Sequence, residues 1–200
     1  MKPEMLTLKH GQTTIKMPAS IVAQAVMASA LAQLQPVAAP ALAPSAHSIP
    51  QVGEYWPGQG GINGGLVAAH GDGPAHYLIF ATEDAGKHKW GGYEKESAAT
   101  SKRDGAANTQ ALLADGGHPA AEAAAMYSGD GHNDFFLPAA AELYQGWLNV
   151  PSIFAKDRYY WSSSQRSADL AFYMTFGGGY QDDFGKTNEL SVRPVRRLFI

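Results

Sequence analysis

Alternating apolar and polar residues at the start of the chain predict a short β-hairpin. The turn would centre on Gly11, and alternate positions of each strand would share one face. Four apolar residues would lie on that face: Leu6, Leu8, Ile15 and Met17. A run rich in alanine, valine, methionine and leucine follows and predicts a helix from Ser20 to Gln35.

The small residues of this predicted helix suit packing against helices of other copies. They suit packing on the helix's own domain equally well, so both remain open. Its apolar part, Ile21 to Ala32, follows three lysines as in an export signal. The strand-like residues before it and Gln24 within it argue against cleavage. No segment reaches the roughly 20 apolar residues of a membrane span.

Four prolines then punctuate the chain at positions 36, 40, 44 and 50. Proline at this spacing excludes a helix and favours an extended spacer. The chain therefore divides into an anchoring or oligomerisation segment (1–35), a Pro/Ala-rich linker (36–50) and a larger domain (51–200).

The pattern of residues 51–200 predicts strands at both ends and helices between them, an α+β domain whose termini pair in one sheet. The first strands lie in GEYWPGQGGINGGLVAAH and HYLIFAT. The expected helices are Ala106–Leu113, Ala120–Tyr127 and Ala139–Leu148. The expected later strands are Tyr159–Ser163, Ala171–Phe176 and Ser191–Leu198.

Composition narrows the function classes. The chain has 200 residues, with 15 Lys+Arg against 18 Asp+Glu, so neither nucleic acid nor an anionic membrane is indicated as a partner. It contains no cysteine, which excludes disulfides, thiolate nucleophiles and cysteine-based metal sites.

Eight segments occur in the order typical of one domain family: GEYWPGQGGINGG, HYLIFAT, KWGG, DGAANTQALL, HPAAEAA, DFFLPAAAEL, YYWSSSQ and VRPVRR. Together, over residues 52–197, they resemble the Lcl C-terminal-type domain of bacterial surface adhesins and of phage or prophage proteins. The resemblance implies a C-type-lectin-like fold and a ligand-binding module, often trimeric, that recognises host-surface glycans or proteins. Residues 1–35 lie outside it.

A more distant similarity is to the variable proteins of diversity-generating retroelements, which share that fold and vary residues near the C-terminus. Diversification of this chain is a hypothesis on that basis. The sequence departs from calcium-dependent lectins, because their Glu-Pro-Asn, Gln-Pro-Asp and Trp-Asn-Asp motifs are absent. We therefore expect no calcium-bridged sugar site.

No motif predicts catalysis, a cofactor or a metal. Ser162–Ser164 lack a Gly-x-Ser-x-Gly elbow and should bond to backbone groups. The seven histidines are scattered, and SGDGHND resembles a calcium loop in composition only. The glycines of GQGGINGG precede no helix, so they should pack against Trp56 rather than cradle a phosphate. Glu142 should pair with Arg193 or Arg196, since a buried arginine needs a partner.

The segment from Gln165 to Asn188 has the composition of a binding surface. Alternation in LAFYMTF would bury Leu170, Phe172, Met174 and Phe176, and would turn Ala171, Tyr173 and Thr175 outward between loops 165–169 and 180–188. Tyrosine suits recognition because it offers a large contact area with few rotamers. The predicted ligand-binding residues are Gln165, Arg166, Asp169, Tyr173, Thr175, Tyr180, Gln181, Asp182, Asp183 and Asn188.

Three functional hypotheses follow. The first is a phage or prophage tail-tip protein, located in the virion, that binds a host glycan or protein as a homotrimer and docks on a tail fibre or baseplate through residues 1–35. The second is a secreted or surface-anchored adhesin. The third is an enzyme like the sulfatase activators that share the lectin-like fold, but those enzymes use cysteines that this chain lacks.

Overall fold

The computed structural model describes residues 4–11, 13–24, 27, 49–71 and 73–200 and divides the chain into two units, Met1–Ser48 and Ile49–Ile200. In the first unit, β1 (Met5–His10) pairs antiparallel with β2 (Thr13–Pro18), with Leu6 opposite Met17. The predicted hairpin is thereby confirmed. Residues 19–24 and 27 are helical. The rest of the predicted helix and linker residues 36–48 lie outside the described residues.

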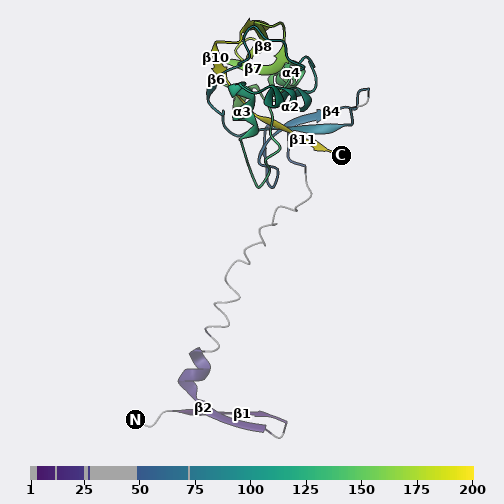
Figure 1. Ribbon diagram of the computed structural model, residues 1–200. Coiled ribbons are helices and arrows are strands. Elements are labelled where there is room, and N and C mark those ends of the chain that lie inside the picture. Colours follow the sequence, from purple (N-terminus) through teal and green to yellow (C-terminus); the bar gives the residue numbers. More distant parts are fainter. Residues whose placement is uncertain (1–3, 12, 25–26, 28–48, 72) are drawn as a thin grey trace. The chain divides into compact units, whose positions relative to one another are not determined.

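The second unit combines two sheets with three α-helices, which confirms the α+β class (Figure 1). One sheet has the order β6-β10-β7-β8-β9 and the other β11-β5-β4-β3. Helix α4 contacts strands of both sheets. The strands are β3 (Tyr55–Trp56), β4 (Gly61–Val67), β5 (His76–Phe80), β6 (Lys87–Lys89), β7 (Tyr159–Gln165), β8 (Leu170–Thr175), β9 (Gln181–Gly185), β10 (Glu189–Ser191) and β11 (Val195–Phe199). The helices are α2 (Gly105–Asp115), α3 (Pro119–Ala125), α4 (Ala140–Asn149) and the short 3₁₀ helix η1 (Pro151–Ile153).

The three predicted helices are present, and local signals explain where they begin. Asp104 caps α2 by accepting a hydrogen bond from the amide of Ala107 at 3.1 Å. Pro119 is the first residue of α3. Its missing amide hydrogen breaks no helical hydrogen bond there, because amides of the first turn have no acceptor within the helix. The prediction that both ends of the domain meet in one sheet is confirmed, since β11 pairs with β5 beside β4.

Two predictions about strands were wrong. The single strand expected over Ser191–Leu198 is two strands in different sheets, β10 and β11. Pro194 lies between them and has no amide hydrogen to continue a ladder. The expected loop Tyr180–Asn188 contains β9, an edge strand that pairs with β8. An edge strand tolerates polar residues, so its sequence QDDFG lacks apolar alternation.

The core of the second unit consists of two apolar clusters. One packs Trp90 and Trp161 against the small residues of α3 and against Leu112 of α2. The other surrounds Phe154, whose ring stacks on Phe176 with centroids 3.6 Å apart. Each fully buried large side chain contributes about 1.5–3 kcal/mol. Strands β7 and β8 supply residues to both clusters, so their backbones are held from two sides.

The glycines of residues 58–65 allow close packing of several groups. Trp56 lies opposite Gly61 in the β3–β4 pairing, and its ring meets Tyr77 edge-on, with ring centroids 5.2 Å apart. Other glycines of this segment also allow close approach. A Cβ on Gly64 would meet the ring of Phe80, and one on Gly60 would meet the backbone of Gly129. Gly60 also has φ +74°, a conformation that favours glycine.

Three arginines near the C-terminus each pair with a distant carboxylate. Arg193 Nε lies 2.7 Å from Asp84 Oδ1 in an ionic contact that lacks hydrogen-bond alignment. Arg196 binds Asp134 through two nitrogens, at 2.7 and 3.1 Å. Glu142 pairs with Arg197 at 2.7 Å, so the prediction of Arg193 or Arg196 as its partner was wrong. Neighbouring residues of a strand point to opposite faces, so Arg197 reaches Glu142 of α4 while Arg196 points the other way.

Among the described residues, no helix has the length and apolar character needed to cross a bilayer.

Candidate functional site

Aromatic side chains gather on one face of the five-stranded sheet at its β9 edge. The pairing places Tyr173 opposite both Trp161 and Asp182, and Tyr159 opposite Thr175. The Tyr173 ring stacks on Tyr159 at 5.0 Å between centroids and meets Phe184 edge-on at 6.0 Å. We call Tyr159, Tyr173, Tyr180 and Phe184 the aromatic surface. Tyr159, Tyr180 and Phe184 are 47%, 59% and 40% exposed.

The same face of the sheet is firmly anchored at its other end. Trp161 and Ala171 are fully buried there, and the Trp161 indole nitrogen donates to the carbonyl of His88 at 2.9 Å. Tyr173 packs partly against this cluster and reaches the open end. The prediction that Ala171 faces outward was wrong, because Ala171 is fully buried in the cluster around Trp161. Phe172, expected in the core, is only half-buried.

Tyr180 and Thr175 fix the turn between β8 and β9. The Thr175 amide donates to the Tyr180 carbonyl at 2.9 Å, and the Tyr180 hydroxyl donates to Asp182 at 2.9 Å. That hydrogen bond raises the pKa of Tyr180, with a further contribution from the negative charge of Asp182. Burial raises the pKa of Tyr173. Both hydroxyls therefore stay protonated at neutral pH. The Tyr173 hydroxyl can donate to a ligand, whereas the Tyr180 hydroxyl already donates to Asp182 and can only accept from one.

Two of the predicted ligand-binding residues have structural roles instead. Gln165 is only 4% exposed. Its side chain accepts from Lys186 Nζ at 2.8 Å and from the Ser97 amide at 3.0 Å, and it donates to Glu96. Its assignment to an outward loop was therefore wrong. Gln181 donates to the Ala140 carbonyl at 2.6 Å, which directs its side chain toward α4.

Four more of the predicted residues lie around β9 but outside the aromatic surface: Arg166, Asp169, Asp183 and Asn188. Arg166 and Asp183 form an ion pair at 3.6 Å. Asp183 lies opposite Phe172, on the reverse face of the sheet. Asn188 donates to the Gly185 carbonyl at 2.9 Å and closes a turn, and Asp169 is exposed. The structure thus brings together Tyr173, Thr175, Tyr180 and Asp182 of the predicted set.

Sequence reasoning missed Tyr159 and Phe184. Tyr159 precedes the buried Tyr160, so strand alternation alone could have placed it on the exposed face. Phe184 follows Asp182 by two residues, and that spacing becomes informative only once β9 is known to be a strand.

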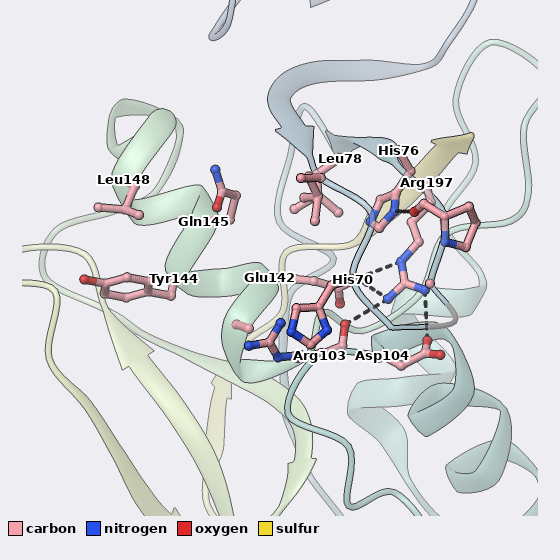
Figure 2. A pocket seen from close by; sticks show the side chains of 15 residues that line it. His70, His76, Leu78, Arg103, Asp104, Glu142, Tyr144, Gln145, Leu148 and Arg197 are labelled. Atoms are coloured by element: carbon pink, nitrogen blue, oxygen red, sulfur yellow. Dashed lines mark hydrogen bonds and ion pairs between the residues drawn. The ribbon is translucent and has the colours of Figure 1, made fainter. Parts of the chain in front are cut away.

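A second candidate site is a cavity of about 510 Å³ (Figure 2). Four segments far apart in the sequence line it: α4, the β4–β5 connection with the strand ends beside it, the residues before α2, and β11. Tyr144 and Leu148 come from α4, Leu78 from β5, and Arg197 from β11. No contiguous motif marks these positions, so sequence reasoning did not find the cavity.

One wall of this cavity is a charged cluster. Arg197 contacts Glu142 at 2.7 Å and Asp104 at 3.0 Å, as Figure 2 shows. Burial raises the pKa of Glu142 to about 7, although the Arg197 guanidinium acts in the opposite direction. His76 has its Nδ1 2.9 Å from the Pro74 carbonyl, and burial lowers its pKa.

Within the described part of the chain, no group of three or more histidine or acidic residues could hold a metal ion. The hydroxyls of Ser162 and Ser164 donate to the carbonyls of Phe172 and Ser101, at 2.9 and 2.7 Å, so these serines bond to the backbone as predicted. His118 is buried with its Nδ1 3.1 Å from the Trp90 carbonyl. These contacts are those of a structural core.

No protein-family model matches the chain, and a comparison with curated proteins finds no match.

Proposed function

We propose that this chain is a non-catalytic recognition protein that binds a host cell-surface glycan or protein through the aromatic surface. The observation that carries the proposal is the exposure of Tyr159, Tyr180 and Phe184 on a sheet whose interior end is tightly packed. Tyrosines on a rigid support lose little entropy on binding and combine apolar contact with hydrogen bonding. The resemblance to lectin-like adhesin and phage domains supports a C-type-lectin-like fold for residues 51–200.

The biological setting that we propose is a phage or prophage tail tip, with residues 1–35 docking on a tail fibre or baseplate and joining copies into a homotrimer. In the hairpin, Leu6 and Ile15 are 45% and 50% exposed. A two-stranded hairpin alone is marginally stable, so a partner would cover these residues. Several linked copies would also strengthen a weak single-site affinity. The alternative setting is a secreted or surface adhesin.

The test is binding of labelled full-length protein to a glycan array and to a panel of bacterial strains. Tyr173→Ala, Tyr180→Ala and Asp182→Ala should each reduce binding roughly tenfold or more, as expected for central contact residues. Tyr55→Ala is the matched control, because Tyr55 is also exposed and also bonds an aspartate, but in the other sheet. Equal binding by all four variants would exclude the aromatic surface.

Two further measurements test the proposed trimer and the proposed location in a phage particle. Light scattering of the full-length protein should give a trimer, and a strict monomer would contradict the assembly. Fractionation of producing cells should find the protein in particles, whereas recovery on the outer surface or in the medium, with a new N-terminus, would favour the adhesin.

A further inference from the structure

We propose that the cavity beside α4 is a second binding site, and that it takes a small organic anion with an apolar body. This goes beyond the recognition role and does not depend on it. The cavity volume of about 510 Å³ lies within the range of small-molecule pockets.

The interior of the cavity is apolar. Leu78 is fully buried at its lining, and Val67 of β4 lies beside the residues of α4. Ala141, Gln145 and Leu148 are spaced four and three residues apart, which places them on one face of α4. Ala141 is small, so this face leaves room that a larger side chain would fill. An apolar ring or branched chain would be removed from water here.

The charged wall at one end is already compensated. Arg197 contacts both Glu142 and Asp104, and it also donates to the Arg103 carbonyl at 3.0 Å. The second Glu142 oxygen accepts from the amides of Ala139 and Gly105, at 2.8 and 3.2 Å. These groups hold one another in place and offer a ligand little free hydrogen-bonding capacity.

Arg103 differs from Arg197, although it lines the same cavity. Among the residues that the structure describes, its guanidinium has no hydrogen-bond or ion-pair partner. Arg103 is exposed, so its charge is kept at the cavity without a large desolvation cost. The planar guanidinium suits a carboxylate or a similar oxyanion.

The charges that face the cavity favour an anion over a cation. Arg103 and Arg197 oppose Asp104 and Glu142, and the raised pKa of Glu142 leaves part of that residue neutral near pH 7. His76 is uncharged at that pH, because burial lowers its pKa. His70 of the β4–β5 connection also lines the cavity. Gln145, which lines the cavity, can hydrogen-bond a polar group of the ligand.

The experiment uses the full-length protein and three probes of similar shape and different charge: phenylacetate, phenylacetamide and phenethylamine. Binding is followed by amide NMR shifts at probe concentrations up to about 10 mM. A ligand of about ten non-hydrogen atoms should bind in the millimolar range. We expect phenylacetate to bind about tenfold more tightly than phenylacetamide, and phenethylamine to bind most weakly.

Two variants separate charge from shape. Arg103→Gln should lower phenylacetate affinity to that of phenylacetamide and leave the amide unchanged. Ala141→Phe should fill the cavity and weaken both probes tenfold or more. Arg158→Gln, an exposed arginine elsewhere in the domain, is the matched control and should change neither. Each variant is first checked for an unchanged melting temperature.

The proposal is overturned if no probe shifts the resonances of residues that line the cavity, if the three probes bind equally, or if Arg103→Gln keeps the preference for the acid. It is independent of the aromatic surface. Tyr180→Ala should leave phenylacetate binding intact even where it abolishes cell binding, so failure of one proposal is distinguishable from failure of the other.

Discussion

Two regions of the domain, one around β11 and one around β9, each contain an arginine–aspartate pair. The pair near β11 is buried, and the pair near β9 is exposed. Around β11, Arg193 is 5% exposed and pairs with Asp84, more than a hundred positions earlier in the chain. Around β9, Arg166 pairs with Asp183 from a side chain that is 60% exposed. The first contact joins distant segments in the interior, and the second joins neighbours at the surface.

This difference indicates which residues can change freely. Breaking a buried pair leaves an uncompensated charge in the protein interior, whereas an exposed pair contributes little because water replaces it. The arginines near β11 therefore fix the fold, and the residues around β9 can vary in identity while the sheet persists. A recognition surface benefits from that arrangement, since its specificity can change without loss of stability.

The largest predicted effect comes from breaking the buried pair. Arg193→Met removes the closer of the two arginines beside Asp84, leaving Arg158 at 3.5 Å, and it removes the donors to the carbonyls of Ala81 and Ile153, at 2.9 and 2.7 Å. We expect the free energy of unfolding to fall by about 3–5 kcal/mol. Chemical denaturation of the full-length protein measures it, with circular dichroism as the signal.

The matched control is Arg166→Met, which removes the arginine of the exposed pair. Its expected cost is under about 1 kcal/mol. If the two substitutions cost the same, the contrast between the two regions is wrong as a statement about stability.

The next effect is a pH dependence that arises at Glu142. Its pKa is raised from 4.5 to about 7 in the folded protein, chiefly by burial. The folded state therefore holds a proton that the unfolded state releases. The resulting stabilisation is fully present below pH 4.5 and is lost as the pH rises through about 7. Its size is roughly 3 kcal/mol.

Melting temperatures of the wild type and of Glu142→Gln, measured from pH 4.5 to 8.5, test this prediction. The wild type should lose stability across that range, and the glutamine variant should lose less, because its side chain cannot ionise. Glu189→Gln replaces an exposed glutamate and should retain the wild-type profile. Parallel profiles for wild type and Glu142→Gln would show that Glu142 does not bind the proton.

The sequence predicted what depends on local pattern. Asp104 and Pro119 located the starts of α2 and α3, an alanine-rich run indicated α4, and runs typical of strands located β7 and β8. Pairings depend on which segments meet in three dimensions. Arg193, Arg196 and Arg197 lie within five residues of one another, and only the orientation of β11 decides that Arg197 meets Glu142. The sequence therefore indicated that a buried arginine needs a carboxylate partner, but it did not identify which arginine pairs with Glu142.

The candidate sites show the same limit. Tyr173, Thr175, Tyr180 and Asp182 were predicted from composition and alternation, and they lie together because β9 pairs with β8. The polar residues of β9 concealed that strand, so Phe184 was missed and Gln181 was placed in a loop. The cavity combines residues from four segments, none of which has a pattern specific to it.

The smallest effects on stability should come from the surface tyrosines. Two Tyr–Asp pairs, one at each sheet of the domain, allow a framework position to be compared with a position on the aromatic surface. Tyr55 donates to Asp130 at 2.7 Å, a bond that raises its pKa to about 12, and Tyr180 donates to Asp182. Asp130 also accepts from the amides of Gly58 and Gly60, at 2.8 and 3.2 Å, whereas Asp182 shows no such additional contact among the described residues.

Asp130→Asn should therefore lower both the pKa of Tyr55 and the melting temperature, because the loop amides lose a charged acceptor. Asp182→Asn should lower the pKa of Tyr180 and leave the melting temperature unchanged. Alkaline titration of the protein with labelled tyrosine rings, followed by carbon NMR, measures both pKa values. A clear fall in melting temperature for Asp182→Asn would mean that the aromatic surface is part of the framework. In that case recognition would have to rest on fixed residues rather than on ones that can be exchanged.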